Sequence, residues 1–445
     1  MTRHQCRATK KWNGRLRRFL VCFAPGHAQY CAPSIHGYPM PIPTMPDLPA
    51  RLHRIRPSPS SMASQRARAL RGQGRDVLAL TAGEPDFDTP QHIQEAARRA
   101  MASGQTRYTD VGGTPELKEA IAGKFRAENG LHFSPDEIIV GAGAKQVIFN
   151  ALMCTVRAGD EVIVPAPYWV SYPDIVWLAG GMPVHVDCPA SLGFKLQPEA
   201  LEQAITARTR WLILNSPNNP SGAAYLFAEL QALAEVLKRH PQVWVMTDDV
   251  YEHILYGDMP FASIAQVAPE LRERILTVNG VSKAYAMTGW RIGYGAAPAQ
   301  LIEAMVKLQS HSTSGASSIG QAAAVAALTG RQDFIATNRA VFRQRRDMVV
   351  AALDAIDGIH CHLPDGAFYV FASCADLFGL RTPTGRVIRS SDDWIGHLLD
   401  SQDLAALQGS AYGVGTHFRL SCASSGEHLR EGCRRIARAR AQLGP

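Results

Sequence analysis

The chain has 445 residues, of which 46% are apolar, and this is enough to bury the core of one large domain or two. Its net charge of +7 is uneven, because residues 1–75 carry fourteen Lys and Arg against one acid, Asp47, whereas the rest carry 32 bases and 38 acids. The folded part therefore offers no basic stripe for nucleic acid. No apolar run approaches the roughly 18 residues of a membrane span, so we expect a soluble protein that does not enter a membrane.

The nine cysteines are dispersed singly, without a C-x-x-C pair or a zinc-like spacing against His. An odd, scattered set is typical of reduced thiols, so we expect a cytoplasmic location and no metal site. A basic and apolar stretch at residues 15–24 has an apolar core shorter than the roughly 7–15 residues of a signal peptide. The thiol usage also argues against secretion.

Residues 1–50 are rich in Pro, Arg and His, lack helical or strand periodicity, and end in the proline-dense run 38–46. Such a segment cannot bury enough apolar surface to offset its ordering entropy. We expect either a flexible extension or the product of a start codon assigned too early, with Met45 as the true start. The folded part is expected to begin near Leu52.

From Val77 onward, short β-branched runs alternate with longer amphipathic stretches, which predicts a mostly parallel α/β sheet. Helices are expected at Gln91–Ser103, Pro115–Asn129, Lys145–Val156, Pro198–Ile205, Phe227–Arg239 and Asp333–Ile356. Strands are expected at Glu137–Val140, Glu161–Pro165, Arg210–Asn215, Val243–Thr247, Ile275–Val278, Ala367–Ala372 and His417–Ser421. We predict an N-terminal arm at 51–90 that joins the small domain, a large domain at 91–332, a connecting helix at 333–357 and a small domain at 358–445.

Two of these strands are followed by side chains that could take part in catalysis. Asp248 follows the strand Val243–Thr247, and Lys283 follows the strand Ile275–Val278. Taken alone, an acid at a strand end caps the next helix and a lone lysine is a solvated surface group. Lys283, however, stands in a stretch of Ala, Tyr, Met and Trp, where desolvation would lower its pKa. An imine-forming or proton-shuttling amine needs such a lowered pKa.

Two further strand ends carry small and turn-forming residues. The run 215–222, Asn-Ser-Pro-Asn-Asn-Pro-Ser-Gly, predicts a turn that also places the Asn219 amide at the strand-end crevice. The run 140–145, Val-Gly-Ala-Gly-Ala-Lys, joins a strand to a helix, where free backbone amides bind phosphate. A helix-packing turn explains the glycines equally well. They lack the spacing of a dinucleotide fingerprint, which argues against NAD.

Together these motifs resemble the class I and II aminotransferases of the fold type I pyridoxal phosphate enzymes, and within them the bacterial aspartate aminotransferase branch that includes prephenate aminotransferases. The resemblance extends over about residues 52–440. It implies a mostly parallel seven-stranded sheet flanked by helices, plus a smaller α/β domain. The motifs that carry it are Gly83 to Phe87, Tyr108, Gly143 to Lys145, Pro167 to Trp169, Asn215 to Gly222, Asp248 to Glu252, Ser282 to Arg291 and Phe418 to Leu420.

The resemblance assigns cofactor-binding roles. It implies that Lys283 carries pyridoxal 5′-phosphate covalently and acts as general base and acid, and that Asp248 keeps the pyridine nitrogen protonated. Tyr251 and Asn219 would bond O3′ of the cofactor, and Trp169 rather than Tyr168 would stack on its ring. The implied phosphate ligands are the Gly143, Ala144 and Lys145 amides, the Ser282 hydroxyl, the Arg291 guanidinium and Tyr108 from the neighbouring subunit of a homodimer with shared active sites.

The resemblance specifies the residues that bind the substrate less completely than those that bind the cofactor. Arg419 would clamp the substrate α-carboxylate with help from Asn219 and the Gly83 backbone, beside Trp169. Arg56 stands where this branch has a lysine associated with dicarboxylic substrates, and it is the candidate for a distal carboxylate. The run 314–316, Ser-Gly-Ala, replaces the common Ser-Asn-Pro near the partner's site.

We therefore expect an aminotransferase for aspartate and 2-oxoglutarate that works by a ping-pong mechanism. Prephenate, aromatic or aliphatic substrates remain as alternatives, as does a lyase or synthase of the same fold. A regulator would need a DNA-binding helix-turn-helix ahead of the domain, and residues 1–50 contain none.

Overall fold

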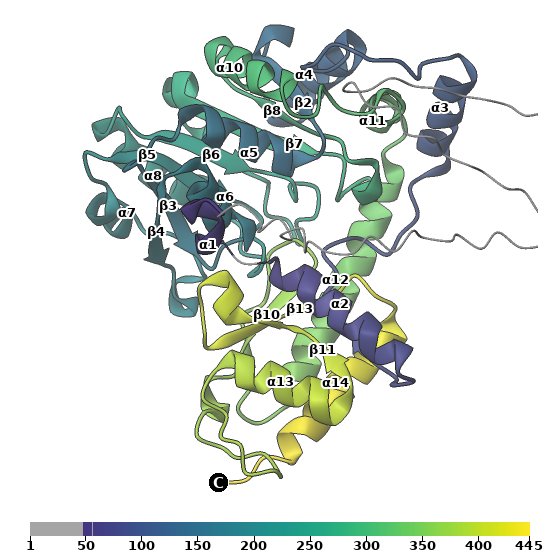
Figure 1. The fold of residues 1–445 in the computed structure, drawn as a ribbon, viewed down its shortest axis with the longest axis vertical. Helices are drawn as coiled ribbons and strands as arrows, with labels where there is room; N and C mark the ends of the chain where they lie inside the picture. Colours follow the sequence, from purple (N-terminus) through teal and green to yellow (C-terminus); the bar gives the residue numbers. More distant parts are fainter. Residues whose placement is uncertain (1–47, 56) are drawn as a thin grey trace, which may run out of the picture. The chain divides into compact units, whose positions relative to one another are not determined.

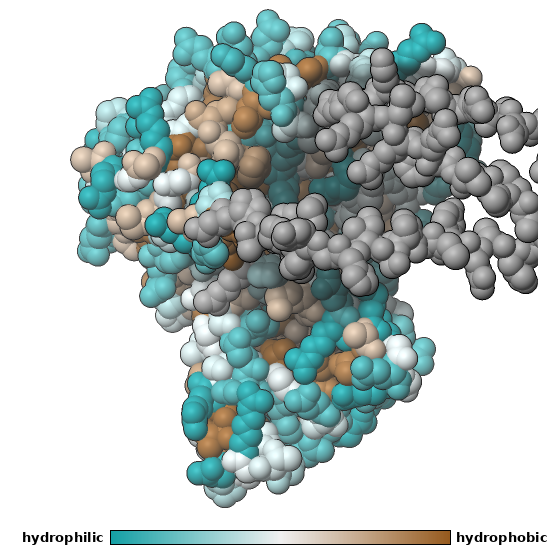
Figure 2. All heavy atoms as spheres, viewed as in Figure 1, coloured by the Kyte–Doolittle hydropathy of each residue, from teal (hydrophilic) through white to brown (hydrophobic). Residues whose placement is uncertain are grey.

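The computed structural model describes residues 48–55 and 57–445; residues 1–47 and Arg56 lie outside it. The expected N-terminal extension falls almost entirely on the undescribed part. Residues 49–445 form one compact unit, so the domain boundaries expected within it stay predictions. None of the described helices is both long enough and apolar enough to cross a bilayer. On the face of the described part that Figure 2 shows, hydrophilic residues predominate and apolar ones form separate patches.

A seven-stranded sheet forms the centre of the larger part of this unit (Figure 1). Its strands lie in the order β2-β8-β7-β6-β5-β3-β4, and β8 alone among them runs antiparallel to its neighbours. This confirms the predicted mostly parallel α/β sheet. The strands are β2 (Ile138–Gly141), β3 (Glu161–Ala166), β4 (Met182–Asp187), β5 (Thr209–Asn215), β6 (Trp244–Asp248), β7 (Ile275–Gly280) and β8 (Gly293–Ala296).

Helices cover both faces of this sheet because its strands are apolar on both sides. In β5, Trp211 and Ile213 pack into one buried cluster and Leu212 and Leu214 into the other. One face carries α5 (Ala144–Thr155), α6 (Ser171–Ala179) and α10 (Ala299–Ser310), and the other carries α7 (Pro198–Ala204), α8 (Phe227–Arg239) and α9 (Ile264–Val267). A further cluster joins the end of the sheet at β2 and β8 to α3 (Gln91–Ala102), α4 (Pro115–Asn129) and α11 (Ser318–Thr329).

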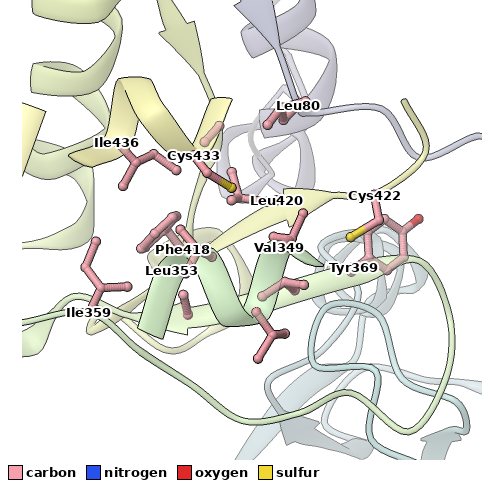
Figure 3. Packing of buried hydrophobic residues seen from close by; sticks show 14 of the residues in the cluster. Leu80, Val349, Leu353, Ile359, Tyr369, Phe418, Leu420, Cys422, Cys433 and Ile436 are labelled. Atoms are coloured by element: carbon pink, nitrogen blue, oxygen red, sulfur yellow. The ribbon is translucent and has the colours of Figure 1, made fainter. Parts of the chain in front are cut away.

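The C-terminal part contains a four-stranded antiparallel sheet in the order β12-β13-β10-β9. Its strands are β9 (His360–Cys361), β10 (Tyr369–Ser373), β12 (Leu407–Gln408) and β13 (His417–Ser421). It packs with α12 (Asp333–Asp354), α13 (Ser391–Gln402) and α14 (Gly426–Ala441) around a core that includes Val349, Phe418 and Ile436 (Figure 3).

The early part of the chain packs with this C-terminal region. The strand β1 (Leu78–Ala79) pairs in parallel with β11 (Leu404–Ala405), and Leu80 enters the same core (Figure 3). Helix α2 (Pro59–Gly72) packs beside them, whereas α1 (Ala50–Arg54) contacts α6 through Arg54, whose guanidinium carbon lies 5.2 Å from the Trp177 ring centroid. Short 3₁₀ turns are η1 (Pro135–Glu137), η2 (Ala190–Leu192), η3 (Pro269–Arg274), η4 (Thr288–Trp290), η5 (Ala375–Leu377) and η6 (Gly409–Tyr412).

The sequence pattern missed two strands of the large sheet, β4 and β8. The β8 residues are Gly-Tyr-Gly-Ala, which have little β propensity. Small residues are required there because a Cβ at Gly293 would overlap the backbone of Gly143 and Ala144. The edge strand β4 is partly exposed and contains Pro183, a residue tolerated only at an edge or a bulge.

Candidate active site

Residues from both sheets line one cavity of about 360 Å³, a volume typical of small-molecule sites. The parallel strands β5, β6 and β7 end at the same edge, where Asn215 pairs with Asp248 and Asp248 with Val278. Lys283 follows β7, and the first turn of α5 follows β2. The other sheet contributes Arg419 of β13. The geometry therefore unites segments that are up to about 360 residues apart in the sequence, from Ser58 to Arg419.

Eleven of the fourteen site residues expected from the sequence line this cavity, namely Gly83, Ala144, Lys145, Trp169, Asn219, Asp248, Tyr251, Ser282, Lys283, Arg291 and Arg419. Gly143 lies directly beside it, against Arg291. Tyr108 is 96% exposed and does not line the cavity of its own chain. Arg56 lies outside the described residues. Trp169 faces the cavity, whereas Tyr168 stacks on His185, with 4.9 Å between ring centroids.

Among the described residues, Lys283 is one of two lysines that line the cavity. Its Nζ donates a hydrogen bond of 2.5 Å to the Gly83 carbonyl and lies 5.7 Å from the Tyr251 ring centroid. Burial lowers the pKa of Lys283, the charge of Arg419 lowers it too, and the Asp248 carboxylate opposes both, so that the resulting pKa is about 8. At neutral pH this amine is mostly protonated, but it gives up its proton far more readily than an exposed lysine, which suits it to act as a general base.

Asp248 is a buried carboxylate with one free oxygen. Its Oδ2 accepts a 2.5 Å hydrogen bond from the Tyr172 hydroxyl, while Oδ1 has no hydrogen-bond partner among the described residues. Burial raises the pKa of Asp248 to about 6, although the Tyr172 hydroxyl and the Val250 N–H oppose the rise. A buried oxygen without a partner is costly, so this carboxylate is suited to a ligand that brings an N–H donor.

The first turn of α5 forms an anion cradle with Arg291. Gly143 precedes the helix at a φ of 89°, and the first N–H groups of a helix lack intrahelical acceptors. A Cβ at Gly143 would collide with the Arg291 guanidinium, so only glycine allows this close approach. Arg291 Nη1 donates to the Thr288 carbonyl at 2.9 Å, which aims the guanidinium at the same turn. The buried Ser282 adds a hydroxyl to the cavity wall.

Arg419 is a buried guanidinium whose hydrogen bonds are incomplete. Nη1 donates to Asn219 Oδ1 and Nη2 to the Thr81 carbonyl, both at 2.9 Å. Nε is buried and has no hydrogen-bond partner within the described part of the chain. A guanidinium is a cation with a planar set of N–H donors, so the side chain is suited to a carboxylate ligand.

Glu252, from the same motif as Asp248, has a structural position. It pairs with Lys124 and accepts hydrogen bonds from Asn129 at 2.9 Å and Asn279 at 2.7 Å. Burial opposes ionisation, but Lys124 and His253 lower the pKa of Glu252 to about 2. Glu128, Glu252 and His253 lie at metal-ligand spacing, but the Lys124 ammonium pairs with both carboxylates there. The network anchors the segment after β6 to α4 and β7.

Two tyrosines of the site were not expected from the sequence. Tyr172 supports Asp248 from the first turn of α6, and its place three residues after Trp169 in the chain was the available signal. Tyr369 begins β10 and contacts both Tyr251 and Arg419. Nothing local marks Tyr369, because its neighbours come from distant parts of the chain.

Comparison with known proteins identifies the family to which this geometry belongs. Residues 75–436 match the family model described as aminotransferase class I and II. The chain belongs to the class I and II aminotransferases. Enzymes of this family use pyridoxal phosphate, and this member is a transaminase of amino-acid metabolism, so the predicted family, fold class and enzyme type are confirmed.

Similar relatives are found among bacterial enzymes. The chain is 53% identical to an aspartate/prephenate aminotransferase of Cereibacter sphaeroides over 86% of this chain and 96% of that protein. It is 54% identical to an aspartate aminotransferase of Rhizobium meliloti over 84% and 91% of the two chains. The crystal structure of the aspartate aminotransferase from Rhizobium meliloti superposes with a TM-score of 0.87 at 52% identity, covering 89% of this chain and all of the other. A Thermus thermophilus aspartate aminotransferase with maleate gives a TM-score of 0.83 at 43% identity, also over 89% of this chain and all of the other.

Proposed function

We propose that the transaminase exchanges amino groups between aspartate and a 2-oxo acid, with glutamate and 2-oxoglutarate as the other pair, by a ping-pong mechanism with pyridoxal phosphate. The observation that carries the proposal is the Asp248 carboxylate, buried with one unpartnered oxygen, in the same cavity as the Lys283 amine and the Arg419 guanidinium. The names of the bacterial relatives support the same substrates.

The residues of the cavity fit the cofactor part by part. Asp248 Oδ1 would accept from the protonated pyridine nitrogen, which would give this orphaned atom its missing partner. The first turn of α5, Ser282 and Arg291 would hold the phosphate. Tyr251 and Asn219 would bond O3′, and Trp169 would cover the ring. When bound, pyridoxal phosphate supplies an aldehyde that condenses with amines and a ring that accepts the electron pair released at the substrate Cα.

Lys283 would carry the proton. With its pKa lowered to about 8, by burial and then by Arg419, the amine would take a proton from the substrate Cα and return it at C4′ of the cofactor. Asp248 would hold the proton on the pyridine nitrogen throughout. Arg419 would bind the substrate α-carboxylate through its free Nε edge, with its plane fixed by Asn219 and Thr81. Bound in this way, the substrate would present its Cα–H bond to the lysine.

Selection for a second carboxylate is assigned to the side chain of Lys145, in addition to the cofactor role of its backbone. Its Nζ lies 4.7 Å from the Trp169 ring centroid, in the cavity, and no described carboxylate lies within ion-pair distance of it. Burial and the charge of Arg291 lower the pKa of Lys145, so a ligand carboxylate would relieve an unfavourable buried charge.

We predict that Lys145→Met raises the Michaelis constant for aspartate by about 10- to 100-fold, the range for losing a hydrogen bond between charged groups, and leaves that for alanine nearly unchanged. Steady-state kinetics with both donors test this. Arg56→Ala is the matched comparison, because Arg56 is the competing candidate. A dicarboxylate-selective effect in Arg56→Ala but not in Lys145→Met would contradict the assignment.

The proposed function is tested by half-reactions. Protein loaded with pyridoxal phosphate is mixed with single amino acids, and the absorbance change to the pyridoxamine form is followed. We expect aspartate and glutamate to react faster than phenylalanine, leucine or alanine. In the reverse half-reaction, the pyridoxamine form should transfer its amino group to prephenate if prephenate is also a substrate. Absence of amino transfer with every donor, or release of ammonia instead, would favour a lyase and overturn the proposal.

The active form is proposed to be a homodimer in which Tyr108 reaches the phosphate site of the partner. The 96% exposure of Tyr108 in the isolated chain supports this, because a large aromatic side chain so exposed gains by burial in an interface. The six described cysteines are free thiols, which supports a cytoplasmic location.

A further inference from the structure

Tyr369 contacts both Tyr251, which is proposed to bind the cofactor, and Arg419, which is proposed to bind the substrate. Its hydroxyl is 2.8 Å from the hydroxyl of Tyr251, the residue assigned to the cofactor. Its ring lies beneath Arg419, the residue assigned to the substrate, with 4.2 Å between the guanidinium carbon and the ring centroid. All three side chains are at most 3% exposed, so water does not screen these contacts.

The sheet fixes this arrangement. In the antiparallel pair of β10 and β13, Tyr369 is opposite Ser421, which makes Arg419 its diagonal neighbour on the same face. The rings of Tyr251 and Tyr369 meet edge to face, with 5.8 Å between centroids and 79° between planes. The ring of Tyr369 therefore supports the guanidinium that Asn219 and Thr81 hold, and its hydroxyl sets the direction of the Tyr251 hydroxyl.

We propose that Tyr369 is a positioning residue that couples carboxylate binding at Arg419 to the hydrogen bond that Tyr251 gives to O3′ of the cofactor. This inference rests on the proposed function. A hydroxyl has one hydrogen, so when Tyr251 donates to O3′, Tyr369 must donate to the Tyr251 oxygen. The positive charge of Arg419 makes the Tyr369 hydroxyl a stronger hydrogen-bond donor. In a series of hydrogen bonds, a stronger donor also strengthens the next hydrogen bond, here the one from Tyr251 to O3′. A carboxylate that neutralises Arg419 weakens this series of hydrogen bonds from Tyr369 through Tyr251 to O3′. The negative charge on O3′ is then less stabilised.

Cofactor absorbance as a function of pH tests the hydroxyl. In the loaded wild-type protein we expect saturating succinate, an unreactive dicarboxylate, to raise the midpoint of the absorbance titration. Tyr369→Phe keeps the ring beneath Arg419 but removes the hydroxyl. It should raise the midpoint without succinate by about 0.5 to 1 pH unit, as expected for one lost hydrogen bond, and should shrink the further rise with succinate. In a Tyr251→Phe background, adding Tyr369→Phe should change the midpoint no further.

Succinate affinity tests the ring. Calorimetry on the cofactor-free protein should give dissociation constants that agree within about threefold for wild type and Tyr369→Phe, and one that is about tenfold weaker for Tyr369→Leu. Tyr256→Phe is the matched control. Tyr256 is also buried, its ring lies 4.5 Å from the Arg346 guanidinium carbon, and its hydroxyl donates to the Ala367 carbonyl, but it does not line the cavity. It should leave the midpoint and the succinate affinity unchanged.

The outcomes separate this inference from the proposed function. A folded Tyr369→Phe protein that titrates like wild type, with and without succinate, would overturn the coupling and leave the proposed function intact. An equal midpoint shift in Tyr256→Phe would reduce the effect to general loosening of the core and overturn it as well. A wild-type protein that takes up no pyridoxal phosphate would contradict both.

Discussion

Replacing Lys283 with alanine should lower aminotransferase turnover by about 10⁴-fold or more while leaving the protein folded. Lys283 supplies the amine that would carry the proton, because its pKa is lowered to about 8, by burial and then by Arg419. The neighbouring cations, Lys145 and Arg291, are held at the α5 end of the site. Coupled assays with aspartate and 2-oxoglutarate give the turnover number, and circular dichroism and sedimentation report the fold and the dimer.

The control for this variant is Lys307→Ala, which removes an exposed lysine of α10. Its turnover should equal that of the wild type. Lys283→Ala should also lose the covalent attachment of the cofactor, so that dialysis removes pyridoxal phosphate from it more readily than from Lys307→Ala. Appreciable turnover in Lys283→Ala would mean that the lysine is misassigned.

The second large effect is expected at Arg419. Arg419→Leu should lower kcat/KM by about 10²- to 10³-fold for every amino acid, because the α-carboxylate that it binds is common to all of them and would be buried without a partner. This lack of selectivity distinguishes Arg419 from Lys145, whose loss should affect dicarboxylates alone. Steady-state kinetics with aspartate, glutamate, phenylalanine and alanine measure the difference.

Arg419→Lys is the matched variant. It keeps the charge but loses the planar fork that now donates to Asn219 and Thr81, so we expect a smaller loss that is again uniform across substrates. Asn219 and Thr81 would lose hydrogen bonds in both variants, and thermal unfolding should therefore accompany the kinetics. A loss in either variant confined to aspartate and glutamate would move Arg419 from the α-carboxylate to the side-chain carboxylate.

Local sequence patterns predicted most of the large sheet correctly. Strands such as β5 and β6 are continuous apolar runs between turns, and helices such as α4 have a capping Thr114 and a left-handed Gly130 at their ends. The strands β4 and β8 lacked such signals. Position 293 must be glycine because the first turn of α5 lies against it. This contact exists only in the folded protein, so the sequence pattern does not reveal it.

The candidate site divides in the same way. Side chains at the ends of parallel strands, such as Asp248 and Lys283, were predictable because chain order and strand direction place them at one edge. The lowered pKa of Lys283 was also predicted, from its apolar neighbours in the sequence, but the electrostatic state of Asp248 was not. The pKa of Asp248 is raised to about 6 by burial, with Tyr172 opposing the rise, and that contact comes from α6. The side-chain role assigned to Lys145 likewise depends on its position over Trp169.

The sequence by itself determined the family, the parallel α/β architecture and the amine, carboxylate and guanidinium of the site, because each is encoded by local periodicity or by a motif next to a strand. Only the tertiary structure decided which atoms keep unsatisfied hydrogen bonds and which side chains connect them. The contact of Tyr369 with Tyr251 and Arg419 depends on the register of β10 against β13 and on the meeting of two sheets. Such contacts join residues far apart in the chain, so no local pattern records them.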